Sequence, residues 1–223
     1  MKKFGIVGKD ISYSQSKKLF DDEFKGKYSY DIIDTDKISK ELLLKYDGLN
    51  VTTPYKIEVM KYLDYVDPKA EKRQSVNCIV NNNGKLEGYN TDYYGFQKSL
   101  EGHKINSMLV LGNGGVLGTI KDYAKTHGIN IVVCGRRGIY DINYKDLWKY
   151  DYDCIVNATK FGVLPPIEYE WIKENTLVFD LCYGETTKFI EECKKFGHEY
   201  CMDGEMMLKY QAQLSWYIWD IKE

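Results

Sequence analysis

The sequence is short of the features that mark several common classes of protein. It has four prolines and three histidines among 223 residues. No stretch of it approaches the roughly 18 consecutive apolar residues of a membrane-spanning helix. Its formal net charge is only −2, which argues against a surface for nucleic acid or another polyanion. We therefore expect no nucleic-acid partner and no membrane segment.

Cysteine and histidine lack the spacing that metal binding or a catalytic triad would need. The six cysteines are widely separated, with no C-x-x-C pair, and the histidines stand alone. We therefore predict no metal site. The sequence also has no G-x-x-x-x-G-K-[ST] phosphate loop and no G-x-S-x-G elbow, which excludes the corresponding nucleotide hydrolases and acyl transferases. Isolated thiols in apolar runs favour a reducing, cytoplasmic location.

What the sequence does contain is the composition and alternation of an α/β protein. Hydrophobic residues make up 43% of the chain and charged residues 29%, which is typical of a folded protein. Short β-branched runs alternate with helical stretches, which predicts a largely parallel sheet. The runs predicted as strands are 4–7, 28–33, 48–51, 76–80, 108–111, 131–134, 154–157 and 177–181. The stretches predicted as helices are 17–24, 39–45, 55–63, 93–100, 116–127, 187–195 and 205–219.

A division into two βα lobes is predicted near residues 91–102, where a helical stretch ends before a fresh strand and a glycine-rich turn. We place the first lobe at residues 1–92 and a compact second lobe at 93–203. The last helix, within 204–223, is apolar on more than one side. We expect it to return to the first lobe and pack there.

The glycine-rich turn follows an apolar run and precedes a helical stretch, with the sequence Gly112-Asn113-Gly114-Gly115. Glycines at such a place let the backbone approach a pyrophosphate, whose charge is met by N–H groups at the helix N-terminus. In the pattern G-x-G-x-x-G the third glycine would fall at Leu117, so a plain structural turn stays open as the alternative.

Two arginines follow the next predicted strand, at the place where dinucleotide folds meet the adenosine ribose. An acidic residue there would favour NAD, whereas the guanidinium groups of Arg136 and Arg137 suit the 2′-phosphate of NADP. The alternative is a solvated strand end.

A second group of polar residues lies around residues 50–56. Alternation along the predicted strand puts Asn50 and Thr52 on one face, and Pro54 can open a helix whose first turn holds Lys56. A lysine placed in this way can act as an acid or base. The plainer interpretation is a helix cap followed by a surface lysine.

Two further segments place polar groups at helix starts. Asp92 stands near the start of a predicted helix, ready to orient a lysine or to accept a substrate hydroxyl. Ser14 and Ser16 precede another, where two hydroxyls and helix N–H groups can hold a carboxylate. Simple helix capping is the alternative for both segments.

Taken in order, these segments resemble the shikimate dehydrogenase family over nearly the whole chain. The order of these motifs along the chain is more specific than any one of them. The matching segments are 14–16, 50–56, 76–77, 90–92, 157–159, 180–183 and 204–212.

The resemblance implies a reversible NADP-dependent reduction of 3-dehydroshikimate to shikimate, a step toward chorismate and the aromatic amino acids, by a monomer or homodimer. It implies that the first lobe binds the substrate, that the second is Rossmann-like and binds NADP, and that Lys56 and Asp92 are the catalytic pair. The implied substrate contacts are Ser14, Ser16, Asn50, Thr52, Asn77, Tyr183 and Gln211. The implied cofactor contacts are Gly112, Asn113, Gly114, Gly115, Arg136, Arg137, Asn157, Thr159 and Gly204.

The sequence departs from the family pattern at several places in both lobes. Tyr13 stands where the family usually has histidine, Lys17 where it has proline, and Tyr93 with Tyr94 where a small residue usually follows the aspartate. The stretch 138–153 is short, so the second lobe is reduced and its strength of NADP binding stays open.

Two other functions fit the same motifs. One is a quinate/shikimate dehydrogenase, with an additional ring hydroxyl on the substrate and NAD as a candidate cofactor. The other is a non-catalytic regulatory protein that keeps the fold and binds shikimate-like ligands. Retention of both Lys56 and Asp92 favours an enzyme, because a binding protein tolerates the loss of either.

Overall fold

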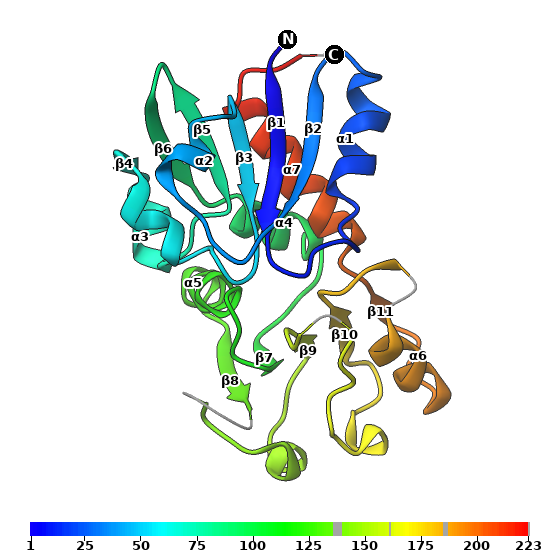
Figure 1. The fold of residues 1–223 in the computed structure, drawn as a ribbon. Coiled ribbons are helices and arrows are strands. Elements are labelled where there is room, and N and C mark those ends of the chain that lie inside the picture. The colour runs from blue at the N-terminus through cyan, green and yellow to red at the C-terminus, as the bar shows by residue number, and fades with distance from the viewer. Residues whose placement is uncertain (136–139, 161, 185–186, 223) are drawn as a thin grey trace. The chain divides into compact units, whose positions relative to one another are not determined.

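The computed structural model describes residues 1–135, 140–160, 162–184 and 187–222 (Figure 1). The chain divides into two compact units. The first unit comprises Met1–Phe96 with Leu208–Glu223, and the second comprises Gln97–Met207. The boundaries thus fall at residues 96 and 207, where the sequence suggested 92 and 203.

The first unit is built on a six-stranded mixed sheet in the order β2-β1-β3-β5-β6-β4. The strands β1, β2 and β3 are parallel, whereas β5 runs antiparallel to both β3 and β6. These two antiparallel pairings are exceptions among described strand pairs that are otherwise parallel, as the sequence predicted. Asn83 and Gly84, at φ 51° and 87°, close a two-residue hairpin between β5 and β6. The strands are β1 (Lys3–Gly8), β2 (Ser29–Asp34), β3 (Gly48–Val51), β4 (Tyr65–Val66), β5 (Cys78–Asn82) and β6 (Lys85–Tyr89).

The helices of the first unit include two that differ from expectation. The predicted helix at 55–63 is instead a turn followed by the short 3-10 helix η1, because the carbonyl of Lys56 accepts from Val76 N and is not used within a helix. The helix α3 was not predicted, although Asp67 caps it and proline occupies its first position. The helices are α1 (Ser16–Phe24), α2 (Lys40–Leu43), η1 (Glu58–Tyr62), α3 (Pro68–Arg73), α4 (Asp92–Ser99) and α7 (Glu205–Ile218), of which α4 and α7 each cross a boundary between the units.

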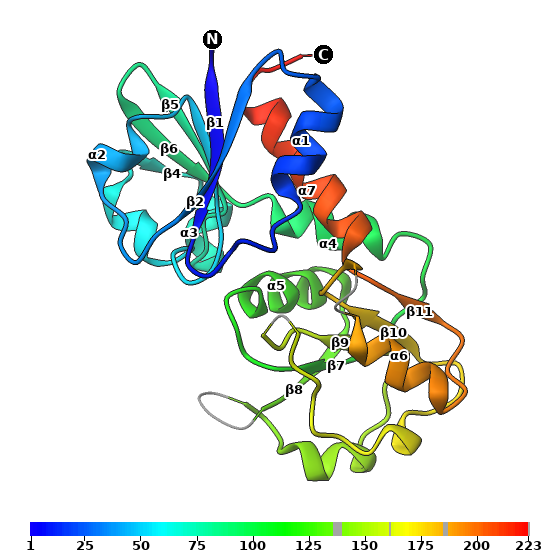
Figure 2. The ribbon, with the colours of Figure 1, turned by 45° about the vertical axis from the view of Figure 1, so that its right-hand side comes forward.

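The expected return of the last helix to the first lobe is confirmed. In Figures 1 and 2, α7 lies beside α1 against the β1–β2 side of the sheet. The Trp219 ring stacks on Phe4 with ring centroids 4.9 Å apart, and its Nε1 donates to the Ile79 carbonyl at 2.8 Å. Gly48 makes room for this indole, because a Cβ on that residue would lie 2.5 Å from Trp219 Nε1.

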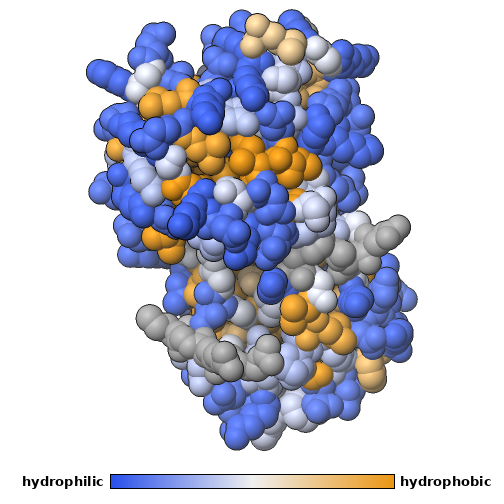
Figure 3. Space-filling model, viewed as in Figure 1, coloured by the Kyte–Doolittle hydropathy of each residue, from blue (hydrophilic) through white to orange (hydrophobic). Residues whose placement is uncertain are grey.

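The other face of the same sheet carries a second apolar cluster, which includes Val7, Leu43, Leu49 and Val51. Figure 3 shows hydrophobic side chains gathered over β1, β2 and β3 on the side seen there, within a mainly hydrophilic surface. The residues of β3, and those of β1 after Lys3, are buried whichever face they point to, as their continuous apolar sequence requires.

The second unit contains a five-stranded, wholly parallel sheet in the order β11-β10-β9-β7-β8. Its strands are β7 (Ser107–Leu111), β8 (Asn130–Cys134), β9 (Cys154–Asn157), β10 (Leu177–Asp180) and β11 (Cys201–Met202). Its helices are α5 (Leu117–His127), η2 (Tyr144–Lys149), η3 (Tyr169–Trp171) and α6 (Lys188–Lys195). From β7 the chain passes to β8 on one side of that strand. After β8 it crosses back to form β9 on the other side of β7, so the strand order reverses at β7.

No helix in the described parts of the chain is both long and apolar enough to cross a membrane.

Candidate active site

The first unit contains a partly buried ion pair between two residues that are 36 positions apart in the sequence. Lys56 Nζ lies 2.6 Å from Asp92 Oδ2. The side chains are 18% and 8% exposed, so the pair is largely shielded from water while the lysine keeps some contact with it. A shielded pair of this kind holds both groups in a fixed geometry, in contrast to the exposed lysine–carboxylate pairs on the surface.

The Asp92 carboxylate is bound on both of its oxygens. While Oδ2 faces Lys56, Oδ1 accepts from Asn77 Nδ2 at 2.9 Å. Asp92 is the first residue of α4, but the helix is capped by Asn90, whose Oδ1 accepts from Tyr93 N at 3.2 Å. Asp92 is therefore not needed as a cap, and its carboxylate is directed at the lysine.

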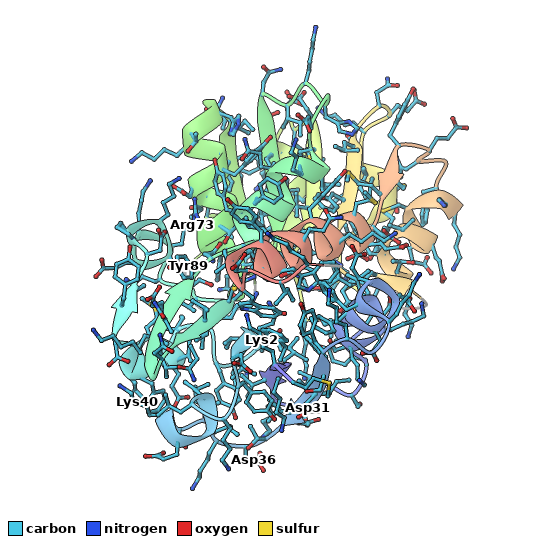
Figure 4. The ribbon with its side chains drawn as sticks, turned by 90° about the horizontal axis from the view of Figure 1, so that it is seen from above. Lys2, Asp31, Asp36, Lys40, Arg73 and Tyr89 are labelled. Carbon is cyan, nitrogen blue, oxygen red and sulfur yellow. The ribbon has the colours of Figure 1, made fainter. Side chains whose placement is uncertain are left out.

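The residue after this aspartate is also held in place. The guanidinium carbon of Arg73 lies 4.1 Å from the centroid of the Tyr93 ring, an attractive cation–π contact. Arg73, labelled in Figure 4, extends from the end of α3, so the contact joins α3 to the first turn of α4. An aromatic residue at position 93 thus has a structural partner in this chain.

A polar network surrounds the pair and connects it to α7. Asn77 Nδ2 donates to Thr91 Oγ1 at 2.9 Å and lies 3.4 Å from Gln211 Oε1, while Asn77 Oδ1 accepts from Thr91 N at 2.7 Å. Gln211 Nε2 donates to the Leu208 carbonyl at 3.0 Å, which directs Oε1 toward Asn77 and Thr91. The structure therefore brings Lys56, Asp92, Asn77 and Gln211 together.

Asn50 is buried behind this network. Its Nδ2 donates to the Asn77 carbonyl at 3.3 Å and to Ser215 Oγ at 3.0 Å, and its Oδ1 accepts from the Tyr30 hydroxyl at 2.9 Å. Both amide hydrogens are thus used within the protein, which leaves the Oδ1 oxygen as the group able to accept one more hydrogen bond.

Sequence reasoning missed three members of the network: Tyr30, Thr91 and Ser215. Thr91 lies within residues 90–92, which the sequence analysis matched to the family, and its hydroxyl contacts Asn77 and Ser215. Ser215 follows Gln211 by four residues, so helical periodicity places both on one face of α7 and would have found it. Tyr30 gives no signal in the sequence beyond its place in a strand.

The predicted carboxylate-binding residues lie where the chain leaves β1 and β3. Ser14 Oγ accepts from Ser16 N at 3.3 Å, and Ser16 is the first residue of α1. Thr52 follows β3, and its Cγ2 lies beside Gly8, where a Cβ would be only 2.6 Å away. Lys17, the departure from proline, donates to the Tyr30 carbonyl at 2.8 Å and so ties α1 to β2.

In the second unit, the glycine turn lies against the loop that follows β9. Gly112 has φ 98°, and a Cβ on it would come within 2.9 Å of the Ala158 carbonyl, so a glycine is required on both counts. Gly115 has open space around its Cα, with nothing within 4 Å of an added Cβ. The two loops meet at the carboxyl ends of β7 and β9, where the strand order reverses, which is where open α/β sheets bind their ligands.

The loop after β9 is held by its own polar contacts. Asn157 Oδ1 accepts from Thr159 N at 3.1 Å and from Thr159 Oγ1 at 2.7 Å, while Asn157 Nδ2 donates to Asp180 Oδ1 at 3.0 Å. Burial raises the pKa of Asp180 above its usual range, although the bonds from Cys182 N and Asn157 oppose this. Asn157 and Thr159 thus shape the surface that faces the glycine turn.

The remaining predicted site residues fall in two groups. Tyr183 follows β10, and Gly204 packs so closely on the Leu181 carbonyl that a Cβ there would overlap it; Gly204 N also donates to Cys182 O at 2.8 Å. Gly204 therefore has a packing reason to be glycine apart from any cofactor. Arg136 and Arg137 lie outside the described residues.

No group of three or more histidine, cysteine, aspartate or glutamate side chains within the described ranges could hold a metal ion. The described groups are instead a lysine–aspartate pair on one unit and, on the other, a parallel sheet with a glycine turn at the reversal of strand order. These features are those of a dinucleotide-dependent oxidoreductase.

Comparisons with known proteins agree with this class of enzyme and narrow it to one family. The model of the shikimate dehydrogenase substrate binding domain matches residues 6–79. A shikimate dehydrogenase (NADP(+)) of Clostridium beijerinckii is 31% identical over 93% of this chain and 88% of its own length. The chain therefore belongs to the shikimate dehydrogenase family.

Solved structures extend the likeness to the whole fold. Shikimate dehydrogenase 1 of Peptoclostridium difficile has a TM-score of 0.85 at 32% identity, covering 100% of this chain and 93% of that one. The shikimate 5-dehydrogenase of Thermus thermophilus, solved in complex with NADP(H) and shikimate, has a TM-score of 0.86 at 26% identity, covering 99% and 94%.

Proposed function

We propose that this chain is an NADP-dependent shikimate dehydrogenase, which catalyses the reversible reduction of 3-dehydroshikimate to shikimate in the biosynthesis of chorismate and aromatic amino acids. The observation that carries the proposal is the shielded Lys56–Asp92 pair, 2.6 Å apart, within a network that ends on Gln211. In support, the curated relative is named shikimate dehydrogenase (NADP(+)), and the Thermus shikimate 5-dehydrogenase was solved with NADP(H) and shikimate; both are covered for most of their length.

The pair provides acid–base chemistry at the carbon that is oxidised or reduced. In the oxidation direction one member of the pair removes the hydroxyl proton, and in the reduction direction Lys56 returns it. Asp92 keeps the ammonium in position, while Asn77 on its second oxygen prevents the carboxylate from turning away. NADP supplies the hydride chemistry when it is bound.

The substrate is a small cyclic acid that carries hydroxyl groups, so its binding site needs both a carboxylate cradle and hydroxyl partners. We assign the carboxylate to Ser14, Ser16 and Thr52, which follow the carboxyl ends of β1 and β3. The ring hydroxyls are assigned to Asn50, Asn77 and Gln211, whose amides are already oriented by the network. Tyr183 completes the proposed substrate contacts.

The second unit has residues that fit NADP. Gly112, Gly114 and Gly115 form the turn before α5, and the open space at Gly115 lets a pyrophosphate approach the backbone. We assign Asn113 to the same phosphate-binding turn, and Asn157, Thr159 and Gly204 to the neighbouring loops. Arg136, with Arg137 beside it, is assigned to the 2′-phosphate from its sequence position.

All six cysteines are free thiols, and five of them are buried. Burial raises the pKa of Cys78 and Cys182 to about 12, so these thiols are unreactive. Free thiols throughout a chain suit a reducing compartment, and we propose a cytoplasmic enzyme.

The test is a cofactor-reduction assay with purified protein, shikimate or quinate as substrate, and NADP or NAD as cofactor. We expect the highest kcat/KM for shikimate with NADP. A higher value for quinate or for NAD identifies a quinate/shikimate dehydrogenase instead. Binding of shikimate by calorimetry without turnover of either acid identifies a non-catalytic binding protein.

A further inference from the structure

Ser215 lies at the centre of a buried series of hydrogen bonds that joins β3 to α7. It is fully buried, at 0% exposure. Its Oγ donates to the Gln211 carbonyl, one helical turn earlier, at 2.9 Å. Because a hydroxyl has a single hydrogen, Ser215 Oγ is then an acceptor toward its other neighbours.

Those neighbours include two polar side chains from separate segments, Asn50 on β3 and Thr91 between β6 and α4. Asn50 Nδ2 lies 3.0 Å from Ser215 Oγ, and Thr91 Oγ1 lies 3.3 Å from it. With the serine hydrogen committed to Gln211, Thr91 is the donor whenever its contact with Ser215 is formed. The alternatives for the Thr91 hydrogen are Asn77 Oδ1 and Gln211 Oε1, each also 3.3 Å away.

The Asn50 amide has one orientation that satisfies these contacts. Its second Nδ2 hydrogen points at the Asn77 carbonyl, and its Oδ1 accepts from Tyr30. A flipped amide would place Oδ1 against the Asn77 carbonyl, two acceptors facing each other. Tyr30 and Ser215 therefore bind opposite ends of one amide and act on it jointly.

We propose that Ser215 is a positioning residue for substrate binding, which together with Tyr30 fixes the direction of the Asn50 amide. The proposal rests on the proposed function, because the hydroxyl-binding role of Asn50 and Gln211 is part of it. Without Ser215 Oγ, an Asn50 hydrogen loses this acceptor, and the Thr91 hydroxyl turns toward Asn77 Oδ1 or Gln211 Oε1. The Lys56–Asp92 pair stays intact, whereas the groups that bind ring hydroxyls lose their fixed directions.

The variant Ser215→Ala tests this directly. We expect the KM for shikimate to rise by about tenfold, with kcat changed far less and the KM for NADP unchanged. The matched control is Ser75→Ala, because Ser75 is equally buried, at 1% exposure, but its Oγ has no hydrogen-bond partner among the described residues. This control should keep the wild-type KM.

A double variant separates positioning from a general effect of packing. Ser215→Ala and Tyr30→Phe each remove one contact of the same amide, so their combination should raise KM by less than the product of the single effects. Simple multiplication of the two effects contradicts the proposal. A fall in melting temperature with an unchanged KM for shikimate also contradicts it, because the serine would then be only structural.

The same variants distinguish this inference from the proposed function. If wild-type protein turns over shikimate and Ser215→Ala does so with unaltered KM, only the inference fails. If wild-type protein binds shikimate without turnover, calorimetric dissociation constants replace KM in the comparison. If wild-type protein neither binds nor oxidises shikimate, the proposed function and the inference fall together.

Discussion

Lys56 Nζ lies 2.6 Å from one carboxylate oxygen of Asp92, and the other oxygen of that carboxylate accepts from Asn77. The Asp92 carboxylate therefore cannot rotate without breaking its contact with Lys56 or its hydrogen bond from Asn77. The two members of the pair come from a turn after β3 and from the first residue of α4, and they meet only in the folded first unit.

Replacement of the lysine should affect the chemical step more than substrate binding. For Lys56→Ala we expect kcat to fall by about 10²- to 10⁴-fold, the usual range for a lost acid–base group, with a small change in KM. The control is Lys61→Ala, because Lys61 is a nearby exposed lysine that pairs with Glu58. Steady-state kinetics with shikimate measure both variants. If Lys56→Ala weakens substrate binding as much as it lowers kcat, Lys56 does not act in the chemical step.

Replacement of the aspartate tests whether the two groups work as a unit. Asp92→Asn keeps the shape of the side chain but removes its charge, and we expect a loss of kcat comparable to that of Lys56→Ala. The double variant should be little worse than either single variant, because groups that act together are not additive. Fully additive losses measured in the same assay would indicate two independent roles.

The glycine turn of the second unit should not tolerate a side chain at its first position. Gly112→Ala must shift the Ala158 carbonyl, so we expect NADPH affinity to weaken by about tenfold or more, roughly 1.4 kcal/mol, with shikimate binding unaltered. The control is Gly128→Ala, since Gly128 also has positive φ, at 67°, but has open space around it. Fluorescence titration with NADPH measures both variants, and equal affinities would argue against this turn as the phosphate site.

The choice between the two dinucleotides is predicted to depend on Arg136. We expect Arg136→Ala to weaken NADPH much more than NADH, because only NADPH carries the 2′-phosphate that a guanidinium can bind with two bonds. Arg137→Ala is the comparison, with a smaller effect expected. If Arg136→Ala weakens both cofactors alike, the phosphate is bound elsewhere.

A small residue is required where the returning helix packs on the central strands. Gly48→Ala would place a methyl group 2.5 Å from Trp219 Nε1, and we expect a loss of about 1–3 kcal/mol of unfolding free energy from overpacking. Gly26→Ala is the comparison, because it has open space and only the backbone cost of its positive φ, 83°. Urea unfolding of both variants tests this, and a neutral Gly48→Ala would show that the indole can move.

Much of the fold could be predicted because buried strands and amphipathic helices leave strong periodic signals. The eight predicted strands all exist, and the return of the last helix followed from its apolar faces. The hairpin of β5 and β6 was missed although Asn83 and Gly84 are a strong turn signal. The turn at Lys56 could not be foreseen, because it depends on a backbone bond from Val76, a residue on another segment.

The predicted catalytic pair and its neighbours were recognisable as motifs in order, but their geometry was not. Nothing in the sequence indicates that Asn90 rather than Asp92 caps α4, which is what directs the Asp92 carboxylate at the lysine. Likewise, the burial of the Asn50 amide between Tyr30 and Ser215 depends on three distant segments. Such contacts follow from tertiary packing, which a linear pattern does not encode.

The division of the first unit into two stretches of chain bears on how the protein folds during synthesis. The second unit is continuous, Gln97–Met207, and can assemble its core as soon as the ribosome has released it. The first unit must wait for Leu208–Glu223, because Trp219 covers Phe4 from the far end of the chain. The part that is translated first is therefore completed last, and Phe4 stays without its Trp219 partner until the end of the first unit has been made.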